Sequence, residues 1–163
     1  MRVCLSALLV LALWLSGCGF HLRSKADLPF ATLYVATVSY SPFAEDVKRA
    51  IRAGSSVQVV DQAQQAQATL SILAVSKEKL ILSLSGGGKV REYQLRYKVA
   101  YRLQDASGKD LMASGEISLK RDLIYDDNQV LAKESEEVLL YRDMQGDAVQ
   151  QLLRRLAAVR VAA

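Results

Sequence analysis

Three side chains near the start of the sequence could take part in covalent or metal chemistry: the thiols of Cys4 and Cys18 and the imidazole of His21. Because His21 is the only histidine, a two-histidine zinc site is excluded, and the interior holds no histidine for a Ser/His/Asp triad or a Cys/His nucleophile. Asp126 and Asp127 could serve acid–base catalysis, but they precede a helical pattern and are better explained as helix caps. We therefore expect no enzyme activity, no metal site and no cofactor.

The residues before Cys18 indicate what happens to its thiol. Arg2 gives a positive start, positions 3–14 are almost wholly apolar, and Leu15-Ser16-Gly17 leads directly to Cys18. The apolar run is too short to cross a bilayer and matches a secretory signal, except that a cysteine stands at the cleavage point. Leu-Ser-Gly-Cys resembles a bacterial lipobox. The resemblance implies cleavage before Cys18, a diacylglycerol thioether on its sulfur and an acylated amino group. Several acyl chains anchor stably, since each buried methylene contributes about 0.8 kcal/mol.

This anchor predicts three parts of the chain: a signal peptide over 1–17, a lipidated tether over 18–30 and a single domain over 31–163. Under the sorting rule that accompanies the lipobox, Gly19 in place of aspartate implies export to the outer membrane. Cleavage would leave Cys18 as the only cysteine, so no disulfide could form within the mature chain. With 163 residues, 51% of them hydrophobic, and a formal net charge of +4, the composition fits one globular domain. It excludes a disordered tail and a bundle of membrane helices.

The first part of the domain predicts a strand followed by a helix. Positions 32–39 are rich in β-branched and aromatic residues, as is typical of a buried strand. Ser41 and Pro42 suit the N-cap and first position of a helix, and Gly54 suits its end. We interpret the short apolar stretch 57–60 as a further turn of chain before the sheet resumes.

The middle of the chain alternates with the period of β-strands. Apolar residues stand at even positions between 70 and 84 and at odd positions between 93 and 103. Glycines 86–88 separate these two strands and can adopt the positive φ values of a hairpin turn. A third strand over 117–125 completes a meander. The alternation predicts that the sheet face away from the helices carries Lys77, Lys79, Arg96, Lys98 and Arg102.

The last part predicts a long helix from about Gln129 to Val159, whose core-facing stripe includes Val138 and Tyr141. Gly146 weakens its middle and could mark a bend. The element order is β-α-β-β-β-α, and two helices on one sheet face would bury every apolar stripe. The sequence thus predicts an α+β fold, a two-layer α/β sandwich with two helices packed on one face of a four-stranded mixed sheet.

Charge is segregated along the chain. Residues 77–121 carry ten basic and five acidic side chains, whereas 122–147 carry two basic and eight acidic. Such a distribution can orient an anionic ligand or a protein surface that carries both signs. Lys89 and Arg91 lie at the predicted hairpin tip, where they could meet phosphates or only keep the hairpin edge from pairing with other chains. The modest net charge and the lack of aromatic residues interleaved with the basic ones argue against nucleic acid as a partner.

Four short segments carry a resemblance to a known family: Cys18-Gly19-Phe20-His21-Leu22-Arg23, Glu92-Tyr93-Gln94-Leu95, Leu131-Ala132-Lys133-Glu134 and Gln151-Leu152-Leu153-Arg154-Arg155-Leu156. In these segments the chain resembles the LptE family, lipopolysaccharide-assembly lipoproteins of the Gram-negative outer membrane. The resemblance spans nearly the whole mature chain, and it implies the same two-layer sandwich.

The resemblance also implies partners and a location. A member of this family would plug the lumen of the β-barrel protein LptD one to one, assist its assembly and help deliver lipopolysaccharide to the outer leaflet. Its acyl chains would lie in the outer membrane, and its domain would lie on the periplasmic side and within the barrel lumen. The alternative is another envelope adaptor, bound to peptidoglycan or to a pump and without a role in lipopolysaccharide transport.

Lipopolysaccharide contact in this family is attributed to basic residues in the hairpin loop and at the start of the last helix. The matching candidates here are Lys89, Arg91 and Lys133. The loop departs from the family pattern, because Ser85 and a glycine stand where the family can carry arginine before the turn. Lys133 has a second interpretation as an ion-pair partner of Glu137 on an exposed helix face.

Overall fold

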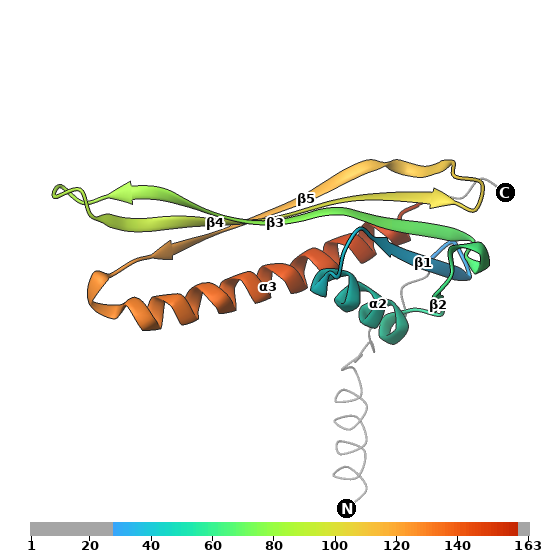
Figure 1. Cartoon of the computed structure of the whole chain (residues 1–163), viewed down its shortest axis with the longest axis horizontal. Coiled ribbons are helices and arrows are strands. Elements are labelled where there is room, and N and C mark those ends of the chain that lie inside the picture. The colour runs from blue at the N-terminus through green and yellow to red at the C-terminus, as the bar shows by residue number, and fades with distance from the viewer. Residues whose placement is uncertain (1–27, 160–163) are drawn as a thin grey trace, which may run out of the picture.

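The computed structural model describes residues 28–159 and shows a long mixed sheet with two helices on one face (Figure 1). In chain order the elements are β1 (Thr32–Thr37), α2 (Pro42–Gly54), β2 (Gln58–Val60), β3 (Ala68–Leu84), β4 (Val90–Asp105), β5 (Asp110–Ile124) and α3 (Val130–Ala157), with short 3-10 turns at Ala63–Gln65 and Asp127–Gln129. The predicted two-layer α+β architecture is confirmed.

The predicted number of strands is wrong: the described residues form a five-stranded sheet in the order β2-β1-β3-β4-β5. The additional strand is β2, which pairs in parallel with β1 from Thr32 opposite Gln58 to Tyr34 opposite Val60. Because β2 has only three residues, no alternation could distinguish it from a turn. On its other side β1 pairs in parallel with β3, and the long strands β3, β4 and β5 form the predicted antiparallel meander.

Helix α2 begins and ends where the sequence predicts. The Ala44 amide donates to Ser41 Oγ at 3.4 Å, and Pro42 occupies the first helical position. After Gly54, the Ser55 hydroxyl donates to the carbonyl of Ile51 at 2.8 Å and satisfies part of the helix end. The buried side of α2 packs on the sheet through Phe43, Ala44, Val47 and Ile51.

One bulge in β3 overturns the predicted orientation of half that strand. Ile72 lies opposite Tyr101, but Ala74 lies opposite the next residue of β4, so Leu73 is an extra residue. An extra residue shifts the side chains that follow it to the other face of the sheet, and this shift holds from Ala74 to Ile81, where the next register irregularity begins. Lys77 therefore lies opposite buried Tyr97 and faces the helix layer.

The bulge reverses the predicted facing of the cations on β3 but leaves that of the cations on β4 unchanged. Lys79, like Lys77, lies on the helix side, so the prediction that both occupy the open face is wrong. Arg96, Lys98 and Arg102 follow β4, which has no bulge there, and they do lie on the open face. The even-numbered apolar residues after the bulge, Leu80 and those that follow, are exposed rather than buried.

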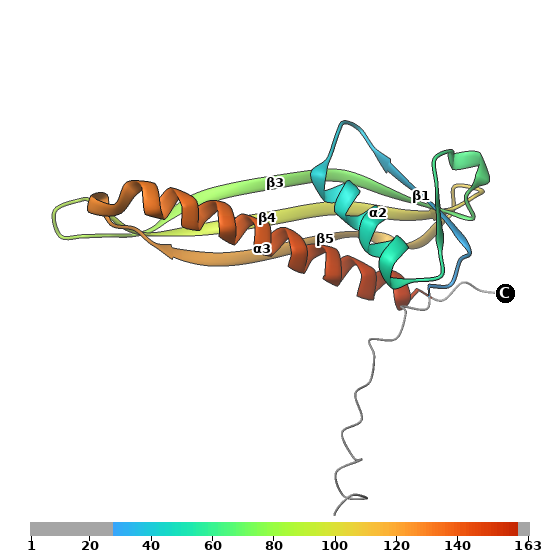
Figure 2. The same ribbon diagram turned by 90° about the horizontal axis from the view of Figure 1, so that it is seen from below.

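Helix α3 runs 28 residues without a break, including at Gly146. It crosses the sheet diagonally, and the shorter α2 fills the space beside its second half only (Figure 2). The inward residues Tyr141 and Leu152 are buried as predicted, whereas Val138 is 68% exposed. At this exposure Val138 is not part of the core, so its predicted place in the core-facing stripe is wrong.

The core extends before the predicted domain boundary. Leu28 and Phe30 are each 6% exposed and belong to the hydrophobic core, although they fall in the predicted tether. The predicted signal peptide, Cys18 and His21 lie outside the described residues. Over 28–159, neither helix combines the length and the apolar character needed to cross a membrane.

Candidate functional site

The predicted binding residues gather at one end of the molecule, here termed the distal end. It holds the β3–β4 turn (85–89), the β5–α3 connection (125–129) and the start of α3 (Figure 1). Lys89 and Arg91 lie at the base of the turn, and Lys133 lies in the first turn of α3. The fold thus brings together residues that are more than forty positions apart in sequence.

Local hydrogen bonds fix the backbone of the distal end. The Ser85 amide donates to the carbonyl of Lys89 at 2.7 Å, and Gly88 adopts φ 78°, a conformation that favours glycine. The Tyr125 amide donates to the carbonyl of Arg91 at 2.8 Å and ties the β5–α3 connection to the hairpin. Asp126 Oδ1 accepts from the Asn128 amide at 2.9 Å, so Asp126 caps the 3-10 turn Asp127–Gln129. The prediction that it caps the long helix is wrong, because the N-cap of α3 is Gln129 and makes no side-chain cap hydrogen bond.

Asp127 does not cap a helix but pairs with the hairpin. Its Oδ2 lies 3.1 Å from Lys89 Nζ, and both side chains are about half or more exposed. An exposed pair of this kind stabilises by at most about 1 kcal/mol. Across residues 28–159, no three histidine, cysteine or acidic side chains group closely enough to hold a metal ion.

The three predicted cations differ in how available they are. Lys133 Nζ lies 2.8 Å from Glu136 Oε2, and only 18% of its side chain is exposed. Its partner is thus Glu136, whereas the sequence suggested Glu137. Lys89 is 75% exposed but paired, whereas Arg91 is exposed and forms no ion pair with any described residue. Arg91 is therefore the most available of the three for an outside anion.

Exposed aliphatic side chains also lie toward the distal end, on the last residues of β3 and β5 and in the first turn of α3. Ile81 is 60% exposed, Leu84 56%, Ile124 67% and Leu131 80%. Sequence reasoning missed this group because the unbroken even-numbered pattern of β3 assigned its leucines to the core. The signal that could have found it is the pair of neighbouring apolar residues, Leu80 and Ile81, which strict alternation cannot bury on the same side.

A cation–aromatic cluster on the helix side holds α3 against the hairpin. Lys79 Nζ lies 2.5 Å from Glu137 Oε2 and 4.3 Å from the centre of the Tyr93 ring. The Tyr93 and Tyr125 rings meet edge to face with centroids 5.3 Å apart, a favourable aromatic geometry. Only 33% of the Lys79 side chain and 22% of Glu137 are exposed, so this pair is less screened than the surface pairs.

Three ion pairs join the basic and acidic parts of the chain. They are Lys79 with Glu137, Lys89 with Asp127, and Arg121 with Asp147 at 2.7 Å. Each joins the 77–121 segment to the 122–147 segment. The segregated charges therefore meet within the fold at these three pairs, whereas Arg91 forms no ion pair with a described residue.

The chain is similar to lipoproteins that carry the same name in two bacteria. The lipopolysaccharide-assembly lipoprotein LptE of Pectobacterium atrosepticum is 29% identical over 148 residues, covering 88% of this chain and 79% of that protein. The protein of the same name from Yersinia pestis is 30% identical over 151 residues, covering 90% of this chain and 72% of that protein.

Solved structures share the fold. The solution NMR structure of an uncharacterized lipoprotein B from Nitrosomonas europaea is 43% identical with a TM-score of 0.76, covering 86% of this chain and 91% of that one. The crystal structure of the rare lipoprotein B from Shewanella oneidensis is 29% identical with a TM-score of 0.68, covering 78% and 94%. The LptE family, described as lipopolysaccharide-assembly, matches residues 30–156. The chain belongs to the LptE family.

Proposed function

We propose that this chain is a non-enzymatic outer-membrane lipoprotein that binds lipopolysaccharide at its distal end and plugs the lumen of the β-barrel LptD. In this role it assists assembly of the barrel and delivery of lipopolysaccharide to the outer leaflet. The observation that carries the lipopolysaccharide assignment is the combination at one end of an exposed, unpaired Arg91 with exposed aliphatic side chains. The names of the LptE relatives, which are lipopolysaccharide-assembly lipoproteins, support it.

The chemistry of the distal end suits an amphiphile that carries phosphate groups. A guanidinium presents a planar fork of donors to a phosphate, and the aliphatic residues offer a surface to acyl chains. Lys89 and Lys133 would join Arg91 only by exchanging their carboxylate partners, Asp127 and Glu136, for the ligand. We therefore expect Arg91 to contribute most and Lys133 least.

Binding of purified lipopolysaccharide to the chain tests this assignment. Arg91→Ala should weaken binding about tenfold or more at low salt, since a charge-assisted hydrogen bond contributes about 1.5–3 kcal/mol, and the loss should shrink as salt rises. Lys89→Ala and Lys133→Ala should have smaller effects of the same kind. Lys109→Ala is the matched control, because Lys109 lies in the β4–β5 turn at the opposite end of the sheet. Unchanged affinity in all three distal variants would remove the site and leave the plug proposal intact.

The surface of the domain suits a polar barrel lumen. Its long faces carry paired charges, among them Lys98 with Glu78 at 2.9 Å and Arg102 with Asp110 at 2.7 Å. Walls inside a barrel are polar, so paired charges can be enclosed there at little cost. A pull-down from detergent-solubilised envelopes should recover a large integral barrel at one to one. Recovery with peptidoglycan or a pump, and without a barrel, would instead support an envelope adaptor.

The anchor belongs to the same proposal. We propose a signal peptide over 1–17 and a lipidated tether that runs from Cys18 to the domain, whose core begins at Leu28, with acyl chains on Cys18 that hold the chain at the outer membrane. Mass spectrometry of the mature chain should find Cys18 acylated and residues 1–17 absent. Cys18→Ser should abolish acylation, whereas Cys4→Ser should leave it unchanged because that residue leaves with the signal peptide.

A further inference from the structure

One edge of the sheet is only partly covered. β1 pairs with β3 from Ala68 to Ile72, and from there to Leu84 β3 has β4 on one side and no described strand on the other. Within residues 28–159, the hydroxyl of Tyr141 reaches this stretch and donates to the carbonyl of Glu78 at 2.8 Å. From Ala74 to Ile81, where the ladder with β4 is regular, alternation turns the amides of every second residue toward the uncovered side. The stretch Leu73–Leu84, here termed the β3 edge, thus offers a row of backbone donors and acceptors.

The β3 edge is also unusually apolar for an exposed strand. Six of the thirteen exposed large hydrophobic side chains among the described residues lie on it: Leu73, Val75, Leu80, Ile81, Leu82 and Leu84. Natural proteins usually protect such an edge with charge, proline or a covering segment. An edge with both unpaired backbone groups and exposed aliphatic residues has the features of strands that bind an extended peptide.

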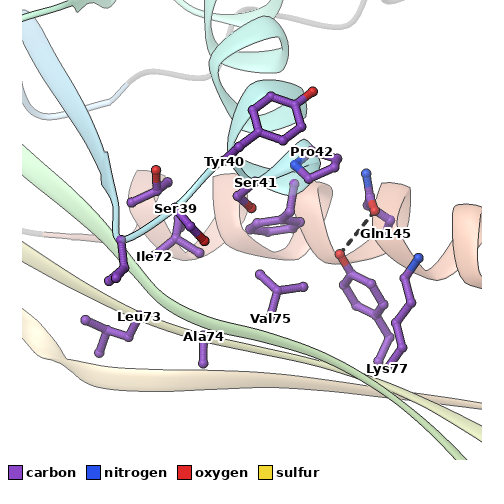
Figure 3. A pocket seen from close by; sticks show the side chains of 14 residues that line it. Ser39, Tyr40, Ser41, Pro42, Ile72, Leu73, Ala74, Val75, Lys77 and Gln145 are labelled. Carbon is purple, nitrogen blue, oxygen red and sulfur yellow. Dashed lines mark hydrogen bonds between the residues drawn. The ribbon is translucent and has the colours of Figure 1, made fainter.

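A pocket of about 280 Å³ opens where the β3 edge begins (Figure 3). It lies where β1 ends and the chain turns toward α2, with Pro42 and Phe43 on the α2 side and Val75 on β3. Tyr97 and Gln145 also line the pocket, and the Tyr97 hydroxyl donates to Gln145 Oε1 at 3.2 Å, the hydrogen bond drawn as a dashed line in Figure 3. The pocket offers space for one apolar side chain in line with the β3 edge.

The charges at the β3 edge indicate which kind of chain would fit. Lys77 lines the pocket and forms no ion pair with a described residue, although its Nζ lies 5.3 Å from the centre of the Tyr141 ring. In the antiparallel register centred on Glu78, a second copy of the chain is a poor occupant, because Lys77 would lie opposite Lys79 and Glu78 opposite itself. Like charges directly opposite destabilise a strand pair, whereas an acidic residue facing Lys77 would stabilise it.

We propose that the β3 edge pairs with an extended segment of the barrel partner, which adds a strand to the sheet beyond β1. That segment would place an acidic residue opposite Lys77 and an apolar side chain in the pocket beside Phe43. This inference rests on the proposed function, in which a barrel surrounds the domain, and it names the surface that the barrel would contact.

Hydrogen exchange of the full chain, alone and in the purified one-to-one complex, tests the pairing. Amides of 73–84 should exchange about tenfold or more slowly in the complex, because new backbone hydrogen bonds close them. The outer strand β5 serves as the internal reference and should change less. A barrel that copurifies while 73–84 exchange as in the free chain would overturn the inference and leave the plug proposal standing. A chain that recovers no barrel would overturn both.

Reversing the charge of Lys77 tests whether the segment that pairs with the β3 edge is acidic. Lys77→Glu should speed exchange of 73–84 in the complex by about fivefold, the effect of about 1 kcal/mol in a cross-strand pair. Lys120→Glu is the matched control, because Lys120 is exposed on β5 and also lacks an ion pair among the described residues. Equal effects of the two reversals would overturn the pairing with Lys77. A dimer of the chain alone, with 73–84 protected, would overturn the proposal and assign the β3 edge to a second copy.

Discussion

Replacing Gly115 by alanine should destabilise the fold, because no space exists for the added methyl group. Gly115 lies opposite Tyr101 across β4 and β5, and a Cβ atom there would lie 2.6 Å from Tyr101 Oη and 2.8 Å from Cζ. The tyrosine cannot move aside easily, since it is 1% exposed and its hydroxyl accepts from Arg155 Nη1 at 2.9 Å. The same nitrogen donates to the carbonyl of Glu116 at 2.9 Å, so a shift of the ring would also disturb the contact between α3 and β5.

The expected cost follows from the two ways in which this site can respond. If the ring stays, the strands must separate, and overpacking of this kind costs about 1–3 kcal/mol. If the ring moves, its hydrogen bond with Arg155 is lost, which costs about 1 kcal/mol in addition to lost packing. We expect Gly115→Ala to lower the free energy of unfolding by about 2 kcal/mol and Tm by about 6–8 °C. Urea titration should show a lower midpoint with an unchanged m value.

Gly146→Ala is the matched control and should change stability in the opposite direction. Gly146 lies inside α3, and a Cβ there would meet nothing within 4 Å. Alanine in a helix interior is favoured over glycine by about 0.5–1 kcal/mol, so this variant should be more stable than the parent. A Gly115→Ala protein as stable as the parent, or equal losses in both variants, would refute the steric reasoning.

Three further predictions concern the hydrogen bonds of Ser41 and Tyr141 and the titration of Asp110. Ser41→Ala should cost about 0.5–1 kcal/mol in thermal unfolding, because α2 loses its N-cap acceptor. Tyr141→Phe should cost about 1 kcal/mol in urea titration and leave the secondary structure seen by circular dichroism unchanged, because it removes only the hydroxyl that donates to Glu78. The hydrogen bond from Arg102, followed by its charge, lowers the pKa of Asp110, so this carboxylate stabilises the fold above its unfolded pKa and loses that effect as pH falls through the folded pKa. Asp110→Asn should therefore flatten the stability profile below about pH 4, and an unchanged acid limb would contradict the pairing.

The elements that sequence reasoning placed correctly are those whose signals are local. Ser41, Pro42 and Gly54 act at the ends of their own helix. Residues that are distant in sequence therefore do not change where this helix begins and ends. The alternation of β4 was equally informative, because this strand lies between two neighbours and every odd residue from Leu95 to Leu103 is buried. The short strand β2 offers neither kind of signal.

The candidate site was predictable in place but not in detail. A hairpin turn and the start of a following helix were both expected, and the meander brings them to the same end of the sheet. Whether a cation there is free depends on residues remote in sequence: Lys89 meets Asp127, whereas Arg91 meets no described acid. No pattern of spacing encodes that difference, since it is decided by which side chains the β5–α3 connection presents to the hairpin.

The bulge at Leu73 connects the charge pattern of the sequence to the surface that remains for partners. Without the extra residue, Lys79 would face away from the helices, and Glu137 on α3 would lose its partner. A half-buried carboxylate without a partner is costly, so the acidic character of α3 and the bulge support each other. The same shift moves Leu80 to the open side of the strand, where it cannot contribute to the core. The bulge therefore joins α3 to the hairpin through the pair of Lys79 with Glu137 and at the same time leaves Leu80 exposed on the β3 edge, where a partner could cover it.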